Sequence, residues 1–266
     1  MPELPEVETI VRTLRPALIG RDVVSAQLLW ARTLASPSPK QFLAQIVGQK
    51  FVEASRRAKF LNFQLSTSNL LIHLRMSGDV YLNDSADPPG RHDRLRLGLS
   101  DGRTLVFNDA RKFGRVWLVA DMDQVVGDLG PEPFDPSFTS QTFYDGLRQR
   151  RRQMKPLLLD QHFIAGLGNI YTDEALHLSG VHPLRVSDTI SALEAEKLFD
   201  AIRSVLQTGL DHNGASFDWV YRGGSFQNYF RVYNRAGQPC PVCGTLILRM
   251  VIGQRGTHFC PTCQVI

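Results

Sequence analysis

Apolar residues near the start of the chain recur with the spacing of a helix. After Pro5 they lie on one helical face, and Gly20 follows the last of them. The residues on this face are Val7, Ile10, Val11, Leu14 and Leu18. Because proline suits the first turn of a helix, the residues before Pro5 should stand directly in front of a rigid element.

From Asp22 to about Ala120 the pattern changes to short β-type runs separated by turn residues. Residues 94–99 alternate polar and apolar, as a half-buried strand does. The predicted strands are Val23 to Trp30, Phe60 to Leu65, Leu70 to Met76, Leu95 to Leu99, Leu105 to Phe107 and Val116 to Val119. This spacing of strands predicts an antiparallel β-sandwich.

Residues 121–136 are rich in aspartate, glycine and proline, which predicts a domain boundary. The pattern beyond them is helical over 139–152, over 171–178 and from the capping box at Ser191 to about Thr208. The chain ends in a small cysteine-bearing module, so we expect an α+β protein of several domains.

Composition adds a basic character that is unevenly distributed. The 266 residues carry a formal charge of only +4, yet residues 219–266 hold five arginines and no acidic residue. A second basic run contains Arg148, Arg150, Arg151, Arg152 and Lys155. Two positive surfaces suit a polyanion such as nucleic acid, although each run alone is equally typical of a solvated face.

The N-terminal residues lack the order of a signal peptide, and no run of about 18 apolar residues could span a bilayer. We therefore expect a cytosolic protein with no membrane association. Thiols stay reduced there, so the four cysteines are not expected to form two disulfides.

The cysteines form two Cys-x-x-Cys pairs, and sixteen residues separate the pairs. Their residues are Cys240, Cys243, Cys260 and Cys263. Two short knuckles that each offer two thiolates predict one tetrahedral zinc ion in a structural role, since four thiolates leave no open position for catalysis. A redox role would need a βαβ context that the sequence lacks. Arg255 is placed at the tip of a β-hairpin between the pairs, within reach of a phosphate.

Pro2 and Glu3 offer nucleophilic chemistry once the initiator methionine is removed. At pH 7.5 roughly a third of an α-amino group is unprotonated, against about a thousandth of a lysine. A terminal proline amine could attack a sugar carbon and form an iminium, while Glu3 transfers the protons. The simpler interpretation is that Pro2 is merely a suitable residue at a chain start.

Residues 166–171 contain a glycine pair before a helical stretch, and the amides of such a helix start bind anions. Lys155 and Asn169 flank the turn. This arrangement favours a DNA-phosphate site over an ordinary turn.

Taken together, these motifs resemble formamidopyrimidine-DNA glycosylase. The matching segments occur in order from Pro2 to Cys263 and so cover essentially the whole chain. They are 2–6, 57–61, 73–78, 109–114, 166–171 and 255–260.

The resemblance implies an N-terminal β-sandwich with an N-terminal helix, a helix-two-turns-helix domain and a β-hairpin zinc finger. We place these at 1–130 (catalytic), 131–231 (DNA-binding) and 232–266. It also implies base-excision repair of damaged double-stranded DNA, with 8-oxoguanine and formamidopyrimidines as substrates and β,δ-elimination of the abasic strand.

By the same resemblance, Pro2 is the Schiff-base nucleophile and Glu3 the acid/base. Lys59 acts in β-elimination, and Arg255 acts in δ-elimination or in binding phosphates. Met76, Arg111 and Phe113 match residues that fill the hole left by the everted base, although Met76 alone would be assigned to strand core. The positions that match other DNA contacts are Glu6, His73, His92, Arg150, Lys155 and Asn169.

One segment departs from the family pattern. Fourteen residues separate Ser216 from Arg231, about four fewer than the family usually has, and residues 222–226 replace its usual Gly-x-Pro-Gly-Tyr. This loop covers the everted base in the family, so the sequence leaves the lesion preference open, as it does the opposite base and protein partners.

Two alternatives remain at this point. An endonuclease VIII-like enzyme for oxidised pyrimidines shares the proline-glutamate start and zinc finger, but Leu4 and the three hole-filling residues favour the purine enzyme. A non-catalytic zinc-finger DNA-binding protein would have no need of Pro2, Glu3 and Lys59. No self-complementary surface is evident, and we expect a monomer.

Overall fold

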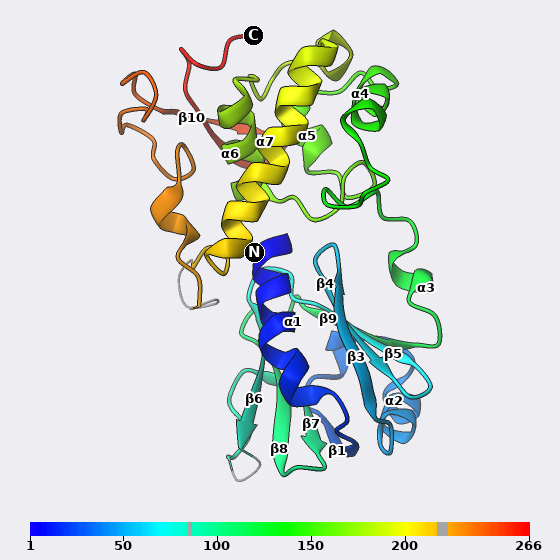
Figure 1. Cartoon of the computed structure of the whole chain (residues 1–266). Coiled ribbons are helices and arrows are strands. Elements are labelled where there is room, and N and C mark those ends of the chain that lie inside the picture. The colour runs from blue at the N-terminus through cyan, green and yellow to red at the C-terminus, as the bar shows by residue number, and fades with distance from the viewer. Residues whose placement is uncertain (85–86, 217–222) are drawn as a thin grey trace. The chain divides into compact units, whose positions relative to one another are not determined.

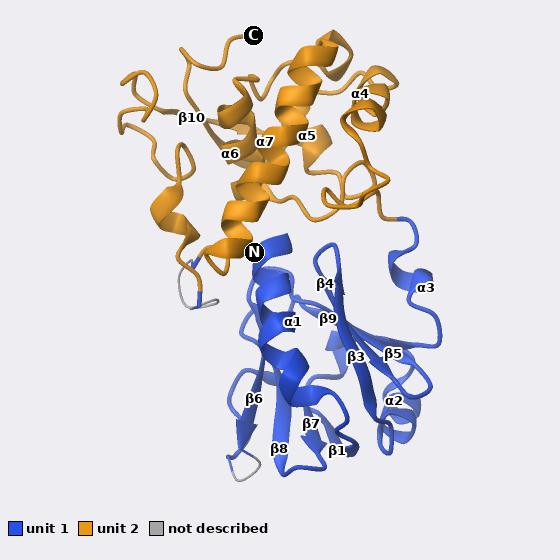
Figure 2. Ribbon diagram, viewed as in Figure 1, with its two compact units in different colours: residues 1–128, 216–223 blue, residues 129–215, 224–266 orange. Residues whose placement is uncertain are grey.

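The chain is described here as a computed structural model, in which residues 1–84, 87–216 and 223–266 are described. It divides into two compact units, one of residues 1–128 with 216–223 and one of residues 129–215 with 224–266 (Figure 2). The predicted combination of a β-sandwich, a helical domain and a zinc-finger hairpin is confirmed.

Two β-sheets form the first unit (Figure 1). The four-stranded sheet has the order β1 (Val23–Leu28), β7 (Asp93–Leu99), β8 (Arg103–Asp109), β6 (Gly78–Asp84). The five-stranded sheet has the order β2 (Leu34–Ser36), β9 (Arg115–Val119), β5 (Asn69–His73), β4 (Phe60–Leu65), β3 (Phe51–Arg57). All neighbours are antiparallel except β2 and β9, which run parallel.

The core of this unit lies between the two sheets. Leu95, Leu97 and Phe107 from one sheet share a single buried cluster with Phe63 and Val116 from the other. The polar face of β7 is also covered, contrary to the predicted half-buried strand. Its arginines tolerate burial because each has a partner: Arg94 Nε donates to the Asp109 carbonyl at 2.8 Å, and Arg96 pairs with Asp93 at 3.0 Å.

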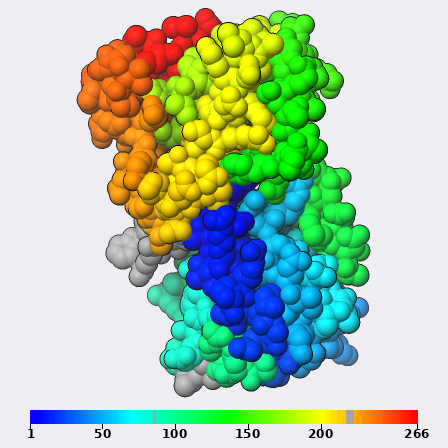
Figure 3. Space-filling model, in the orientation of Figure 1, coloured from blue at the N-terminus to red at the C-terminus, as the bar shows by residue number. Residues whose placement is uncertain are grey.

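Helix α1 (Leu4–Leu18) packs against β3, β4 and β6, so it contacts an edge strand of each sheet. Its predicted apolar face is buried. The opposite surface, dark blue in Figure 3, lies open. The N-terminal residues are thereby attached to a helix that both sheets hold in place.

The structure also contains elements that the pattern did not predict. These are the strands β2, β3 and β6, the helices α2 (Pro39–Ile46), α3 (Asp123–Val126) and α5 (Met154–Leu158), and the short 3-10 turns η1 (Ala31–Thr33), η2 (Ser187–Thr189) and η3 (Phe226–Tyr229). Strand β5 ends at His73 rather than at Met76 because Arg75 has left-handed backbone, with φ of 54°.

Four helices build the second unit: α4 (Ser140–Arg148), α5 (Met154–Leu158), α6 (Asn169–Ser179) and α7 (Ala192–Asp211). The core between α4 and α7 is aromatic, with Phe138 and Phe143 both packed on Phe199. The helix predicted over 139–152 ends at Arg148, because the Arg152 N–H instead donates to Ser187 Oγ at 3.2 Å and Gln153 forms an antiparallel bridge with Val186. No helix in the described ranges has the length and hydropathy needed to cross a membrane.

The C-terminal hairpin consists of β10 (Leu248–Ile252) and β11 (Arg255–Phe259), and β11 packs against α6. Gly253 and Gln254 form its turn with φ of 53° and 64°. Val232 and Ile247 pack with two cysteines in a small core, so the hairpin belongs to the second unit.

Candidate functional site

Pro2 and Glu3 stand directly before α1, and Glu3 is the N-cap residue of that helix. The Glu3 backbone N–H donates to Glu6 Oε2 at 2.7 Å, and the Glu3 carbonyl accepts from the Val7 N–H at 3.1 Å. Glu6 therefore fixes the start of the helix from within its first turn. Pro2, which would carry the terminal amine, is therefore only one peptide bond from this fixed point.

Lys59 lies in the turn between β3 and β4, in the same unit. The preceding Ala58 has φ of 53°, a left-handed conformation that costs a non-glycine residue about 1–2 kcal/mol. Arg56 Nη1 donates to the Ala58 carbonyl at 3.0 Å and so braces this turn. Lys59 itself is buried, which holds its side chain in a defined position.

His73 lies close to Lys59, at the end of the neighbouring strand β5. Burial lowers the pKa of His73 to about 3, with further contributions from the Arg75 and Lys59 charges. Its Nδ1 accepts from the Arg75 N–H at 3.0 Å, and its ring packs edge-on against Phe60. His73 is therefore a neutral imidazole whose Nε2 carries the proton.

The three predicted hole-filling residues lie in two exposed turns. Met76 is 41% exposed and Phe113 is 49% exposed, so Met76 is not strand core. The Arg111 guanidinium lies over the Phe113 ring at 4.8 Å. His92 comes just before β7, and its carbonyl accepts from the backbone N–H of Asp109, near these turns.

Folding separates the residues of the predicted basic run. Arg150 is exposed, with its guanidinium over the Phe163 ring at 5.1 Å. Lys155 is fully buried in α5, where its Nζ donates to Asp173 Oδ1 at 2.6 Å and to the Gly256 carbonyl at 3.0 Å. The prediction that Lys155 contacts DNA directly does not fit this geometry, because the ammonium group is enclosed and already bonded.

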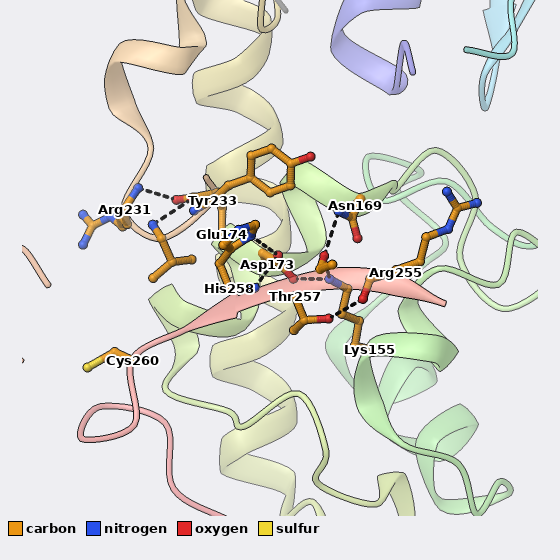
Figure 4. Close-up of polar contacts among 12 residues, drawn as sticks. Lys155, Asn169, Asp173, Glu174, Arg231, Tyr233, Arg255, Thr257, His258 and Cys260 are labelled. Carbon is orange, nitrogen blue, oxygen red and sulfur yellow. Dashed lines mark hydrogen bonds and ion pairs between the residues drawn. The ribbon is translucent and has the colours of Figure 1, made fainter. Parts of the chain in front are cut away.

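Asn169 is the first residue of α6, and Gly168 caps that helix, as the glycine pair predicted. The Asn169 side chain donates from Nδ2 to the Gly256 carbonyl at 3.0 Å (Figure 4). Lys155 and Asn169 thus hold the same carbonyl, which belongs to the residue after Arg255. Arg255 itself is exposed at the start of β11, opposite Ile252.

Two carboxylates on α6 escaped the sequence analysis. Asp173 accepts from Lys155 and, through Oδ2, from the His258 N–H at 2.9 Å. Glu174 accepts from three consecutive backbone N–H groups, those of residues 231–233, at 2.7–3.0 Å (Figure 4). Burial raises the pKa of Glu174, while those three donors oppose the shift. The feature that could have identified these two residues is their position as adjacent acids in a helix whose other residues are mostly buried.

The four predicted cysteines come together at one point. Their sulfur atoms all lie within 4.8 Å of one another. A small contraction would reach the separation of about 3.8 Å that tetrahedral Zn–S bonds of about 2.3 Å give. Hydrogen bonds from Thr245 lower the pKa of Cys243 to about 6, whereas burial raises the pKa values of Cys260 and Cys263. Four crowded thiolates need a cation, and one structural zinc ion fits them.

His177 approaches this cluster without joining it. Its Nε2 lies 3.4 Å from Cys240 Sγ, while the four cysteines alone make up the metal-ligand group found among the described residues. His177 is thus a helix residue that lies beside the cluster and is not one of the four ligands.

Comparison with protein families gives three matches in chain order. Residues 1–116 match the formamidopyrimidine-DNA glycosylase N-terminal domain, and residues 129–219 match the H2TH domain of the same enzymes. Residues 237–265 match the zinc finger found in FPG and IleRS.

Curated relatives match over the full length. The formamidopyrimidine-DNA glycosylase of Chloroflexus aurantiacus is 45% identical and covers 100% of this chain and 98% of its own. That of Protochlamydia amoebophila is 42% identical, with 99% of each chain covered.

Solved structures agree with these relatives. Wild-type Lactococcus lactis Fpg (MutM), in complex with DNA containing N7-benzyl-Fapy-dG, superposes with a TM-score of 0.94 at 34% identity, and both chains are fully covered. MutM in complex with DNA containing carbocyclic 8-oxo-G gives a TM-score of 0.94 at 35% identity, also over both full chains. The chain belongs to the formamidopyrimidine-DNA glycosylase family and is a DNA glycosylase with AP lyase activity.

Proposed function

We propose that this enzyme removes 8-oxoguanine and formamidopyrimidines from double-stranded DNA with Pro2 as its nucleophile. The observation that carries the proposal is the position of Pro2 and Glu3 at the capped start of α1. A nucleophile needs a fixed approach to its carbon, and a helix start held by both sheets supplies one.

In the first step, the Pro2 amine forms a bond to C1′ of the damaged nucleotide while the bond from C1′ to the base breaks. Glu3 transfers protons as the sugar opens, and the departing base takes one of them. The product is an iminium at C1′, which requires that Met1 has been removed so that Pro2 nitrogen is an amine.

The iminium acidifies the proton on C2′, so the same intermediate makes the strand breakable. Lys59 assists loss of the C2′ proton and of the 3′ phosphate in β-elimination. Arg255 assists the δ-elimination that releases the 5′ phosphate, or binds the phosphates beside the lesion. Hydrolysis of the imine then frees Pro2.

DNA contacts come from residues of both units. Met76, Arg111 and Phe113 fill the hole opposite the orphaned base, since exposed apolar and cationic groups suit that task. Arg150 and His92 contact phosphates, and the neutral His73 can donate one hydrogen bond. Glu6 acts by fixing the start of α1, while Lys155 and Asn169 act indirectly by holding the Gly256 carbonyl.

Three further expectations belong to this proposal. The domains are 1–130, 131–231 and 232–266, the protein acts as a monomer, and it works in the bacterial cytosol or nucleoid. The family membership supports the last of these.

The shortened loop bears on the choice of lesion. Residues 217–222 of this loop lie outside the described residues, so the hypothesis rests on sequence alone. A shorter cover over the everted base would shift selectivity toward ring-opened purines or oxidised pyrimidines. Single-turnover rates on each lesion test this hypothesis, and a strong preference for 8-oxoguanine would refute it.

Borohydride trapping tests the mechanism directly. The purified protein is incubated with a duplex that carries one 8-oxoguanine opposite cytosine, beside Pro2→Gly and Glu3→Gln. We expect an adduct for the wild type and its loss for Glu3→Gln. An adduct only on another lesion would keep the mechanism and change the substrate, and no adduct on any lesion would refute the nucleophilic role.

A further inference from the structure

The two exposed turns that carry the hole-filling residues are held in strained backbone. Arg75, next to Met76, has φ of 54°, and Lys112, between Arg111 and Phe113, has φ of 60°. Left-handed backbone costs a non-glycine residue about 1–2 kcal/mol, so something in the surrounding structure must hold both turns.

One buried carboxylate bonds to both turns. Asp109 is 0% exposed, and its Oδ1 accepts from the Ser77 hydroxyl of the first turn. The same oxygen accepts from the Arg111 N–H at 3.1 Å, and Oδ2 accepts from the Gly114 N–H at 2.7 Å, both in the second turn. Both oxygens act only as acceptors, which a carboxylate supplies and an amide does not.

The backbone of Asp109 extends this connection to a third segment. Its N–H donates to the carbonyl of His92 at 2.8 Å, and its carbonyl accepts from Arg94 Nε at 2.8 Å. The space around it is tight, because a Cβ at Gly114 would collide with the Phe107 ring and lie 3.2 Å from Asp109 Oδ2. Few other groups could therefore enter this space and take over the hydrogen bonds that the carboxylate accepts.

We propose that Asp109 is the positioning residue that preorganises Met76, Arg111 and Phe113 for insertion into DNA. This inference rests on the proposed function, in which these three residues fill the hole opposite the orphaned base. Without the carboxylate, the strained turns relax before binding, and each binding event must order them again. Asp109 touches no DNA in this role and acts only through the two turns.

The test uses a duplex with a tetrahydrofuran abasic analogue opposite 2-aminopurine, whose fluorescence reports insertion beside the orphaned base. Asp109→Asn is compared with Asp93→Asn. Asp93 is a matched control because it is also a buried aspartate of this sheet, bonded to Arg96 and Asn108 rather than to the turns. Arg111→Ala serves as the reference for lost insertion.

We expect Asp109→Asn to lose most of the fluorescence change and about tenfold in duplex affinity, as befits the loss of charge-assisted hydrogen bonds. Asp93→Asn should retain both. Borohydride trapping on a single-stranded abasic oligonucleotide, which has no hole to fill, should be unchanged in Asp109→Asn.

Normal insertion by Asp109→Asn would overturn the inference. So would a loss of trapping on the single-stranded oligonucleotide as large as the loss of duplex affinity in the same variant. If Asp109→Asn does not fold, Ser77→Ala removes only one arm of the network and must still reduce the fluorescence change. Failure of the proposed function gives a different result: the wild type would form no adduct on single-stranded abasic DNA, or Arg111→Ala would insert normally.

Discussion

Burial divides the charged residues of the second unit into two kinds. An exposed arginine keeps its hydration and can exchange counterions for a phosphate, whereas a buried lysine must find its partners inside the protein. Arg150 is of the first kind and Lys155 of the second. The sequence shows both as cations in one run, and only folding separates their roles.

This difference predicts distinct outcomes for two substitutions. Arg150→Ala should reduce the slope of log affinity against log salt by about 1, because one phosphate contact is lost. Lys155→Met should leave that slope unchanged but cost about 3–5 kcal/mol of stability, because Asp173 becomes a buried unpaired charge.

Salt-dependent binding and denaturant unfolding measure the two effects. The double variant Lys155→Met/Asp173→Asn is the control, since a neutral amide at position 173 can still accept from the His258 N–H and should recover part of the lost stability. A salt slope that falls in Lys155→Met would contradict the buried role of Lys155.

His73 gives a prediction about pH. Its folded pKa of about 3 lies below the ordinary value of 6.5, so the unfolded chain binds a proton that the folded chain does not. Stability should therefore fall as pH drops from 6.5 toward 3, by at most about 1.4 kcal/mol per pH unit from this residue.

The pH dependence of unfolding in wild type and His73→Asn measures this contribution, since asparagine keeps an acceptor for the Arg75 N–H without titrating. The difference between the two proteins should change over that window and be constant above pH 7. An imidazole NMR signal of His73 that titrates near pH 6.5 would refute the expected burial effect.

At the scale of elements, α6 organises the second unit. Its N-terminus offers backbone N–H groups, Asp173 holds β11 and α5, and Glu174 holds residues 231–233. One helix thus fixes both the glycine turn that precedes it and the hairpin that carries Arg255. Figure 4 shows these contacts meeting from several elements.

The zinc hairpin should depend on its metal more than on its core, since few apolar residues support it. Chelation should therefore unfold residues 240–265 and weaken DNA binding while leaving the β-sandwich folded. Hydrogen exchange measures the local unfolding, and a zinc-sensitive dye measures release. Cys243→Ser is a suitable variant because Cys243 is exposed, so that metal loss rather than a cavity explains its effect. Full DNA affinity in the metal-free protein would contradict this prediction.

Elements whose apolar residues recur with a regular period could be predicted from the sequence. Elements whose formation or end depends on pairing with a distant segment could not. The apolar face of α1 and the capping box that starts α7 are both signals within a short stretch of sequence. Strand β3 has no clear alternation and forms because β4 pairs with it along its whole length. The end of α4 is set by residues 186–187, more than thirty positions away. Local pattern contains no information about either partner.

At the scale of the whole molecule, the proposed chemistry draws on residues far apart in sequence. Pro2 and Lys59 lie in one unit, while Arg255 lies in the other. Spacing alone could identify the zinc ligands, because they occur as two short pairs. It could not connect Pro2 to Lys59 or Arg255, and that connection came from the family resemblance over the full chain.

The single amine at Pro2 makes base removal and strand cleavage inseparable, which predicts the behaviour of an extended chain. A protein with an uncleaved N-terminal tag should lose the covalent adduct and both activities, because an amide nitrogen has no lone pair available for attack. Its affinity for abasic-analogue DNA should fall much less, since Arg111, Arg150 and Phe113 remain. Mass spectrometry establishes the terminus of each sample, and single-turnover excision is measured beside binding. Equal excision by tagged and untagged protein would transfer the nucleophilic role to a side chain, with Lys59 as the first candidate.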